Sequence, residues 1–170
     1  MDEPNPYRSP EARIVGQAAA SDLAGLGERL AAALLDGLML LLINLPLMYV
    51  GGYFRAVFDA AAIGAQPPFS LVLTWAGIGL AIFLLVQGYP LAAWGQTWGK
   101  RILGIRIADL QGGKPSFATL LLRRYAPMQV VSLIPVLGML LVWVDILMIF
   151  RRDRRCAHDL IAGTRVIKVG

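Results

Sequence analysis

The sequence has few of the side chains on which most enzymes depend. Its 170 residues include one cysteine, Cys156, and one histidine, His158. A single cysteine excludes a disulfide within the chain. The chain also lacks an HExxH motif and a serine-nucleophile motif, so it offers neither a recognisable zinc site nor a catalytic triad. We therefore expect no enzyme activity, no bound metal and no cofactor.

Two short motifs invite a chemical role that their details do not support. The segment GQTWGKR at 95–101 resembles a phosphate-binding loop, but three residues rather than four separate its glycines, and Arg101 follows the lysine in place of Ser or Thr. The adjacent pair His158 and Asp159 has no nucleophile or second histidine to work with. We expect that pair to cap or pack a local turn, and we expect no nucleotide site.

Apolar residues are abundant, at 57% of the chain, and the mean hydropathy is +0.62. Soluble domains average roughly 45–50% apolar residues. The run Leu30–Val50 has 21 residues and the run Ser70–Leu91 has 22 residues without a charge. About 20 apolar residues cross the hydrocarbon core of a bilayer, so these runs predict two full membrane spans. Small residues in the two runs favour a closely packed antiparallel pair, namely Ala33, Gly37, Gly77 and Ala81.

The apolar segment Ser116–Phe150 is compatible with two topologies. A single span would place the basic segments before and after it on opposite sides of the membrane, against the positive-inside rule. A hairpin of Phe117–Leu133 and Val136–Phe150, broken at Ile134-Pro135, keeps both basic segments on one side and is favoured. The sequence thus predicts an all-α integral membrane fold with three to four membrane helices: two full spans plus a C-terminal helical hairpin or a third span.

The remaining segments are polar or extended. The stretches LGIRIA at 103–108 and AGTRVIKV at 162–169 each place an arginine two residues after a glycine and next to β-branched residues. We predict that they pair as a small cytoplasmic β element. Residues 1–28 are polar and contain prolines, and we predict a mobile cytoplasmic tail there. Residues 29–169 are then one membrane domain.

Basic residues outnumber acidic ones, with 16 Lys and Arg against 11 Asp and Glu. The excess lies in 100–124 and 151–168, beside apolar runs, whereas the loop 51–69 has Arg55 alone. This pattern predicts a cytoplasmic N-terminus, and anionic lipid headgroups rather than nucleic acid as the partner. The predicted basic cytoplasmic face consists of Lys100, Arg101, Arg106, Arg123, Arg124, Arg151 and Arg152.

Two carboxylates lie within apolar segments. Asp36 follows Arg29 by seven residues, which puts both on one helix face about 10 Å apart, so we expect each to meet a partner on another helix. Asp145 lies six residues before Arg151, at a depth similar to that of Asp36. Intramembrane acids commonly mark ion or proton paths, but an acid paired with a cation only fixes helix packing. Both alternatives stay open, with three arginines as the expected partners: Arg101, Arg123 and Arg124.

The order of these motifs resembles the RDD family of membrane proteins. The motifs are the run from Arg29 to Asp36, GQTWGKRILGIRI at 95–107, Arg123 or Arg124, and HDLIAGTRVIKV at 158–169. The family is named for one arginine and two aspartates. The resemblance places them at Arg29, Asp36 and Asp159, with Asp145 as the competing position for the second aspartate.

The resemblance implies a multi-pass protein of the bacterial cytoplasmic membrane. It also implies a role in transport of ions or small solutes, of the sodium/proton exchange type, through the intramembrane carboxylates Asp36 and Asp145. With so few membrane segments, transport would require a homo-oligomer or a membrane partner. The alternative is a non-transporting scaffold or accessory subunit whose basic cytoplasmic face binds lipid or protein partners.

Overall fold

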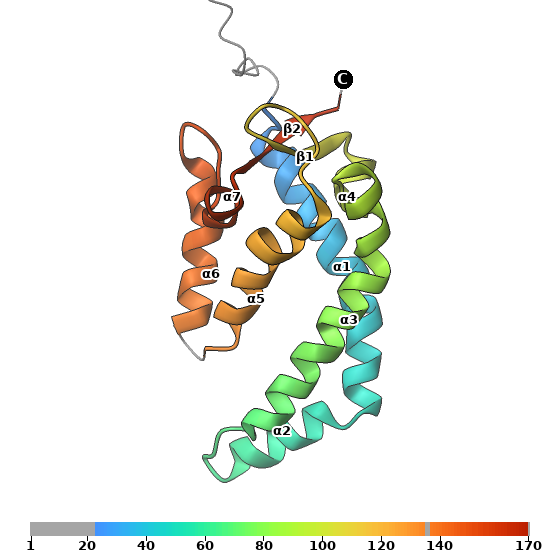
Figure 1. Cartoon of the computed structure of the whole chain (residues 1–170). Helices are drawn as coiled ribbons and strands as arrows, with labels where there is room; N and C mark the ends of the chain where they lie inside the picture. The colour runs from blue at the N-terminus through green and yellow to red at the C-terminus, as the bar shows by residue number, and fades with distance from the viewer. Residues whose placement is uncertain (1–22, 135–136, 170) are drawn as a thin grey trace, which may run out of the picture.

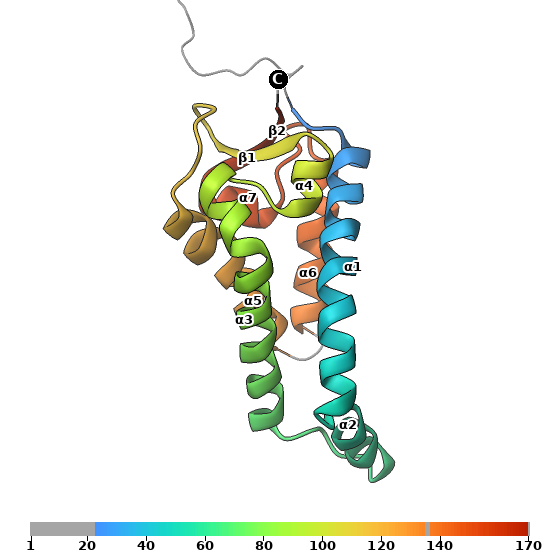
Figure 2. The same ribbon diagram turned by 90° about the vertical axis from the view of Figure 1, so that its right-hand side faces the viewer.

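The computed structural model describes residues 23–134 and 137–169, with no description of the Leu137 side chain. Its longest helices are α1 (Leu26–Val50) and α3 (Phe69–Trp94), which lie side by side and antiparallel (Figures 1 and 2). The short helix α2 (Tyr53–Ala62) joins them at the end far from the strands. Both long helices predicted from the apolar runs are confirmed.

The surfaces of α1 and α3 are apolar and open. Both helices are long and apolar enough to cross a membrane, and only 6% of the most apolar stretch of each is buried. Leu42 is 67% exposed and Leu85 is 84% exposed. Exposed apolar area costs about 25 cal/mol per Å² in water. Two long helices with mostly exposed apolar side chains therefore indicate a membrane protein.

Close packing of small residues does not explain the α1 and α3 pair. No heavy atom lies within 4 Å of where a Cβ would sit on Gly37 or Gly77, apart from each helix's own backbone. The expectation that these glycines bring the two helices together is therefore wrong. A close approach to the α1 backbone occurs instead at Gly99, in the segment after α3, where a Cβ would collide with the backbone oxygen of Ala32.

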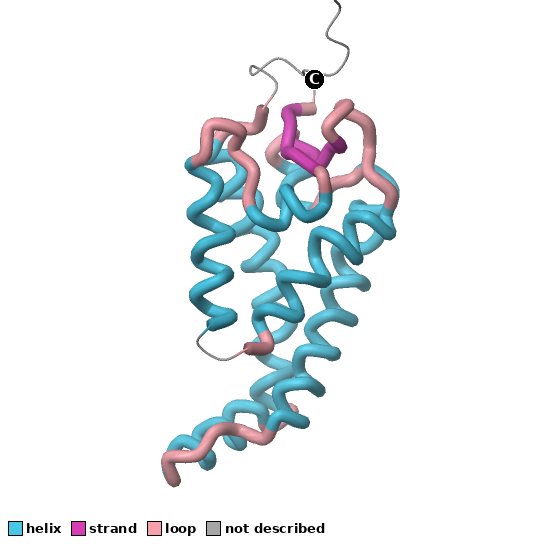
Figure 3. The backbone as a smooth tube through the Cα atoms, turned by 60° about the vertical axis from the view of Figure 1, so that its left-hand side comes forward, coloured by secondary structure: helices cyan, strands magenta, loops and turns pink. Residues whose placement is uncertain are grey.

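The segment after the first strand follows the path of a hairpin. The π-helix η2 (Thr119–Tyr125) continues into α5 (Ala126–Ser132), and α6 (Leu137–Leu147) returns and ends in the 3-10 turn η3 (Met148–Phe150). The hairpin reaches less far from the strands than α1 and α3 do (Figure 3). The predicted break at Ile134-Pro135 falls at the edge of the described residues, and Pro135 and Val136 lie outside them.

Two similar units form the end of the molecule that carries the strands, which we call the sheet end. Helix α4 (Trp98–Ile102) leads into β1 (Ile105–Asp109), and helix α7 (Ala157–Ala162) leads into β2 (Thr164–Lys168). A glycine with left-handed φ joins helix to strand in both, Gly104 at 62° and Gly163 at 64°, which explains the repeated Gly-x-Arg pattern. The strands pair antiparallel, confirming the predicted sheet.

The chain packs against this sheet from Leu23 onward. Leu23 forms a bridge with Ile167, and the Ala24 amide donates to the Val166 carbonyl at 3.1 Å. The domain therefore begins before residue 29, which corrects the predicted boundary of the tail. Residues 1–22 of that tail lie outside the described residues. A small core of Ala24, Ala32, Ile105 and Val166 joins α1 to the sheet.

Candidate functional site

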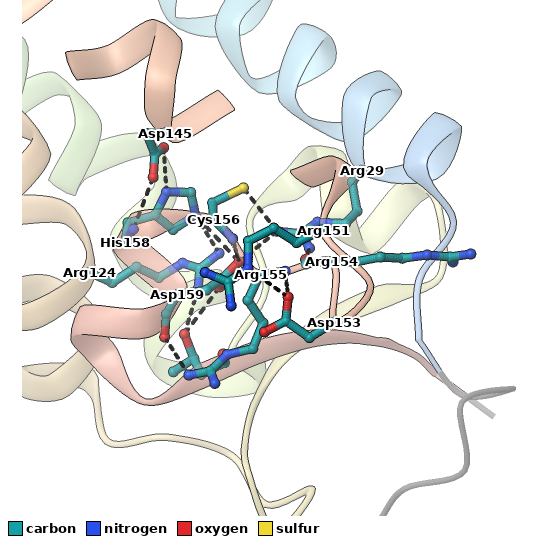
Figure 4. A network of polar contacts seen from close by, with 11 residues as sticks. Arg29, Arg124, Asp145, Arg151, Asp153, Arg154, Arg155, Cys156, His158 and Asp159 are labelled. Atoms are coloured by element: carbon teal, nitrogen blue, oxygen red, sulfur yellow. Dashed lines mark hydrogen bonds and ion pairs between the residues drawn. The ribbon is translucent and has the colours of Figure 1, made fainter. Parts of the chain in front are cut away.

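Asp159 is the most deeply buried charged group of the sheet end. Its side chain, on the first turn of α7, has no exposed surface. Its Oδ2 accepts a hydrogen bond from Arg29 Nη2 of α1 at 2.7 Å, and its Oδ1 accepts one from Arg124 of η2. Two cations from distant parts of the chain thus meet one carboxylate away from water (Figure 4).

The same carboxylate also starts α7 and joins it to β2. The Cys156 amide donates to Asp159 Oδ2 at 3.2 Å, and the Thr164 hydroxyl donates to Oδ1 at 3.2 Å. Burial raises the pKa of Asp159, but the positive charges of Arg124 and Arg29 outweigh burial and hold that pKa well below its usual range. Asp159 is therefore an ionised anchor, consistent with the capping role predicted for it.

Asp36 is held by α3 and by the segment that joins α3 to β1. Its Oδ1 accepts from Gln87 Nε2 at 3.0 Å and from the Gly99 amide at 2.7 Å, and its Oδ2 accepts from the Thr97 hydroxyl. The nearby cation is Lys100, whose Nζ lies 3.9 Å from Oδ2. Lys100, rather than one of the three expected arginines, is thus the charged partner of Asp36.

This arrangement explains why 95–101 resembles a phosphate-binding loop. Thr97 is the N-cap of α4, and the Gly99 amide points out of the first turn of that helix toward Asp36. Amides at a helix N-terminus favour an anion, and the anion here is a carboxylate of the chain itself. The motif thus docks α4 on α1, and Gly99 allows the contact because it has no side chain.

Asp145 pairs with the only histidine. Its Oδ2 lies 2.7 Å from His158 Nδ1, and its Oδ1 accepts from the His158 amide at 2.9 Å. On the other side of the ring, Arg124 Nη2 is 3.1 Å from Nε2. A guanidinium only donates, so Nε2 accepts and the neutral ring carries its proton on Nδ1. Burial lowers the pKa of His158, in agreement with a neutral ring.

The structure does not join Asp36 and Asp145 in one site. Asp36 bonds to α3 and to the segment after it, whereas Asp145 bonds to α7. Within the described ranges, the two carboxylates have no hydrogen-bond partner in common. The two carboxylates were expected at a similar depth in the membrane, but each makes its own contact between segments.

Asp145 could also be a metal ligand. It lies beside Cys156 and His158, and the ligand atoms of the three residues lie within 4.8 Å of one another. Metal binding requires a thiolate and a free ring nitrogen. Burial raises the pKa of the Cys156 thiol to about 11, and both ring nitrogens of His158 are already bonded. Arg29 Nη2 also lies 3.7 Å from the sulfur. The donor set therefore fits packing better than a cation.

Comparison with known proteins identifies the family. A family model described as the RDD family matches residues 23–163. The chain belongs to the RDD family. The uncharacterized protein YckC of Bacillus subtilis (strain 168) is 34% identical over 143 residues, covering 84% of this chain and 83% of that protein. An uncharacterized protein of Haemophilus influenzae is 30% identical over 99 residues, covering 54% of this chain and 56% of that protein. No solved structure gives a significant match.

In this RDD-family chain, the seven basic residues predicted to form one face differ in exposure and fall into three groups. Four are exposed: Arg101, Arg123, Arg151 and Arg152. Arg106 is half-buried and donates to the Gly112 carbonyl at 3.2 Å. Lys100 and Arg124 do not belong to the face, because their side chains are only 14% and 4% exposed. They lie inside the RDD domain because Asp36 and Asp159 need cations there.

Sequence reasoning missed two residues of the site. Gln87 has no exposed surface, bonds to Asp36, and accepts from the Trp98 amide at 2.9 Å. Thr164 is fully buried and lies between Arg124 and Asp159. The sequence alone could have identified Gln87 as a candidate, since it is a lone amide within an uncharged apolar run. Nothing in the sequence distinguishes Thr164, because threonine is common in strands.

Proposed function

We propose that this RDD-family chain is a multi-pass protein of the bacterial cytoplasmic membrane whose sheet end and both termini face the cytoplasm. In this proposal α1 and α3 cross the membrane, and the hairpin of η2, α5 and α6 enters from the cytoplasmic side and returns to it. Support comes from charge, because every Lys and Arg of the described residues except Arg55 lies at the sheet end. Basic residues concentrate on the cytoplasmic side of membrane proteins.

Cysteine labelling in intact cells tests this topology. The native thiol of Cys156 is 4% exposed, so it contributes little background. We expect Ala65→Cys, in the loop after α2, to react with an impermeant reagent added from outside, and Val169→Cys to react only after permeabilisation. Reaction of Val169→Cys in intact cells would contradict the proposed orientation.

Within this topology the best-supported function is that of a non-transporting scaffold or accessory subunit. This proposal rests on the hydrogen bonds of the buried acids. The carboxylates of Asp36, Asp145 and Asp159 each accept hydrogen bonds from donors of the chain itself. An acid that is already bonded is poorly placed to bind and release an ion. By contrast, Arg123 and Arg152 are exposed and have no carboxylate partner in the part of the chain that the structure describes. We assign them to anionic headgroups or an acidic partner protein.

Lipid selectivity measures this role directly. In bilayers that mix phosphatidylglycerol with phosphatidylcholine, spin-labelled lipid reports which headgroup borders the protein. We expect the wild type to favour phosphatidylglycerol, and the double variant Arg123→Gln, Arg152→Gln to lose part of that preference, since each surface cation contributes about 1 kcal/mol. The control Arg55→Gln, at the far end, should leave the preference unchanged. An equal loss in both variants would contradict the assignment.

Sodium/proton exchange is the second candidate, and one observation favours it. Burial lowers the pKa of Lys100 to about 8, and its ammonium lies 3.9 Å from the Asp36 carboxylate. A mostly buried amine that titrates near physiological pH is the type of group that carries protons. Measurement of ion flux in liposomes separates the two candidates. If the wild type shows sodium-driven proton movement and a folded Asp36→Asn variant does not, the protein is an exchanger and the scaffold role is wrong.

A further inference from the structure

A cavity of about 580 Å³ lies between α1 and the returning limb of the hairpin. Its walls are apolar: α1 supplies Leu26, Leu30 and Leu34, and α6 with η3 supplies Ile146, Ile149 and Phe150. The α1 wall extends over about 12 Å of helix. Ligand sites in proteins commonly measure roughly 300–1,000 Å³, so the cavity has the size of a ligand site.

Three cations also contribute to the lining of this cavity. Arg29, Lys100 and Arg124 line it, together with the single carboxylate of Asp145. Both arginines are already bonded to Asp159. Lys100 is less well satisfied.

The Lys100 ammonium has three protons to donate, but its contacts are long. Its Nζ lies 3.4 Å from the Thr97 hydroxyl oxygen and 3.9 Å from Asp36 Oδ2. A mostly buried ammonium with donor capacity left over favours an anion, because burial without full pairing costs free energy. The cavity therefore combines an apolar slot with an incompletely paired cation.

The rim shows where an occupant enters. Leu30 is 57% exposed, Leu34 is 64% exposed and Phe150 is 72% exposed. These side chains belong both to the cavity and to the apolar surface of α1 and the hairpin, so the cavity is continuous with the lipid-facing surface. An occupant that enters by this rim comes from the bilayer.

We infer that this cavity binds one acidic phospholipid from the leaflet at the sheet end, with an acyl chain between α1 and α6 and the phosphate at Lys100. A phosphate there completes the donor set of the ammonium with charge-assisted hydrogen bonds. A zwitterionic lipid gives up part of this gain, because its own cation competes for the phosphate. The site is distinct from the exposed arginines of the proposed function.

Native mass spectrometry of protein released from nanodiscs tests this inference. With equal phosphatidylglycerol and phosphatidylcholine, we expect one phosphatidylglycerol to remain on each protomer. Lys100→Gln should weaken retention about tenfold or more, the scale of a charge-assisted hydrogen bond. Ala33 lines the cavity, so Ala33→Trp should fill it and abolish retention. Leu42→Trp makes a comparable change on α1 outside the cavity and should retain the lipid.

Several outcomes would overturn the inference. Equal retention of both lipids by the wild type would exclude headgroup recognition, and full retention by Ala33→Trp would place the lipid elsewhere. A stable dimer free of lipid would assign the cavity to a second copy of the chain. If Lys100→Gln fails to fold, as judged by circular dichroism, Ala33→Trp alone decides. The surface variants of Arg123 and Arg152 leave this cavity intact, so the two proposals fail independently.

Discussion

The sheet end and the far halves of the long helices satisfy their polar groups in different ways. At the sheet end, Asp159 bonds to residues 35 and 130 positions away in the chain. In the far halves, Asn44 donates to the Leu40 carbonyl at 2.9 Å and Thr74 donates to the Ser70 carbonyl at 2.8 Å, each within one helical turn. One region therefore depends on assembled segments, whereas the other satisfies these side chains within single helices.

This difference assigns separate physical roles to the two regions. A helix in lipid satisfies its own backbone, so the far halves supply an apolar surface of sufficient length without specific polar partners. A buried charge must have a partner, so the sheet end determines which segments meet. Substitutions at the sheet end should therefore change folding, and similar substitutions in the far half should change little.

The largest expected effect is that of Asp159→Asn. The change leaves Arg29 and Arg124 buried without their anion, which typically costs about 3–5 kcal/mol. Thermal unfolding in detergent, followed by circular dichroism, measures the loss. The matched control is Asp59→Asn at the far end, whose carboxylate is 74% exposed and should contribute almost nothing. Equal effects of the two changes would break the comparison between the regions.

Gly99→Ala should come next. The added methyl group collides with the backbone oxygen of Ala32, and overpacking of this kind costs about 1–3 kcal/mol. Gly37→Ala is the control on α1, because the space beside it is open, and alanine in a helix interior is about 0.5–1 kcal/mol better than glycine. The two variants should shift the unfolding temperature in opposite directions. A neutral Gly99→Ala would mean that α4 does not dock on α1 as described.

Asp36→Asn should cost about 2 kcal/mol, because Lys100 and the Gly99 amide lose an anionic partner. The Lys100 side chain is 14% exposed, so water screens part of the loss. Adding Lys100→Gln should restore much of the stability, whereas adding Arg123→Gln should not, since Arg123 is exposed. Chemical denaturation of the three variants measures this coupling, and rescue by Arg123→Gln would show that the partner is misassigned.

A smaller effect is expected from pH. Burial lowers the pKa of His158 below its ordinary 6.5, so below pH 6.5 the unfolded chain binds a proton that the native chain does not. The contribution is fully present above pH 6.5 and is lost as the pH falls toward the lowered value. Stability should therefore decline in this window in the wild type and stay flatter in His158→Gln, since the chain has one histidine. Parallel profiles would contradict a neutral His158.

The smallest expected effect is that of Cys156→Ser, within about 1 kcal/mol, because the change keeps the size of the side chain and a weak polar contact with Arg29. The native thiol should also resist alkylation at neutral pH, because its raised pKa of about 11 leaves almost no thiolate. Labelling before and after denaturation measures this directly. Rapid labelling of the native protein would show that the sheet end opens easily.

Much of the fold was predictable from local pattern. Length and composition predicted α1 and α3, because a membrane span needs only a sufficient apolar run. The placement of Lys and Arg predicted the hairpin, and the Gly-x-Arg repeat predicted the paired strands. The resemblance to the RDD family points to Arg29, Asp36 and Asp159, with Asp145 as the alternative to Asp159, and the structure places all of them in polar contacts between segments.

Only the tertiary structure decided which cations those acids meet. Arg123 and Arg124 are adjacent and chemically identical, yet the turn of η2 leaves Arg123 exposed and buries Arg124 against Asp159. The sequence also did not show that Lys100, rather than an arginine, faces Asp36. An apolar span is a property of one segment, so composition determines it. A buried ion pair joins two segments, and its partners are determined only once the backbone brings their atoms within a few ångströms of each other.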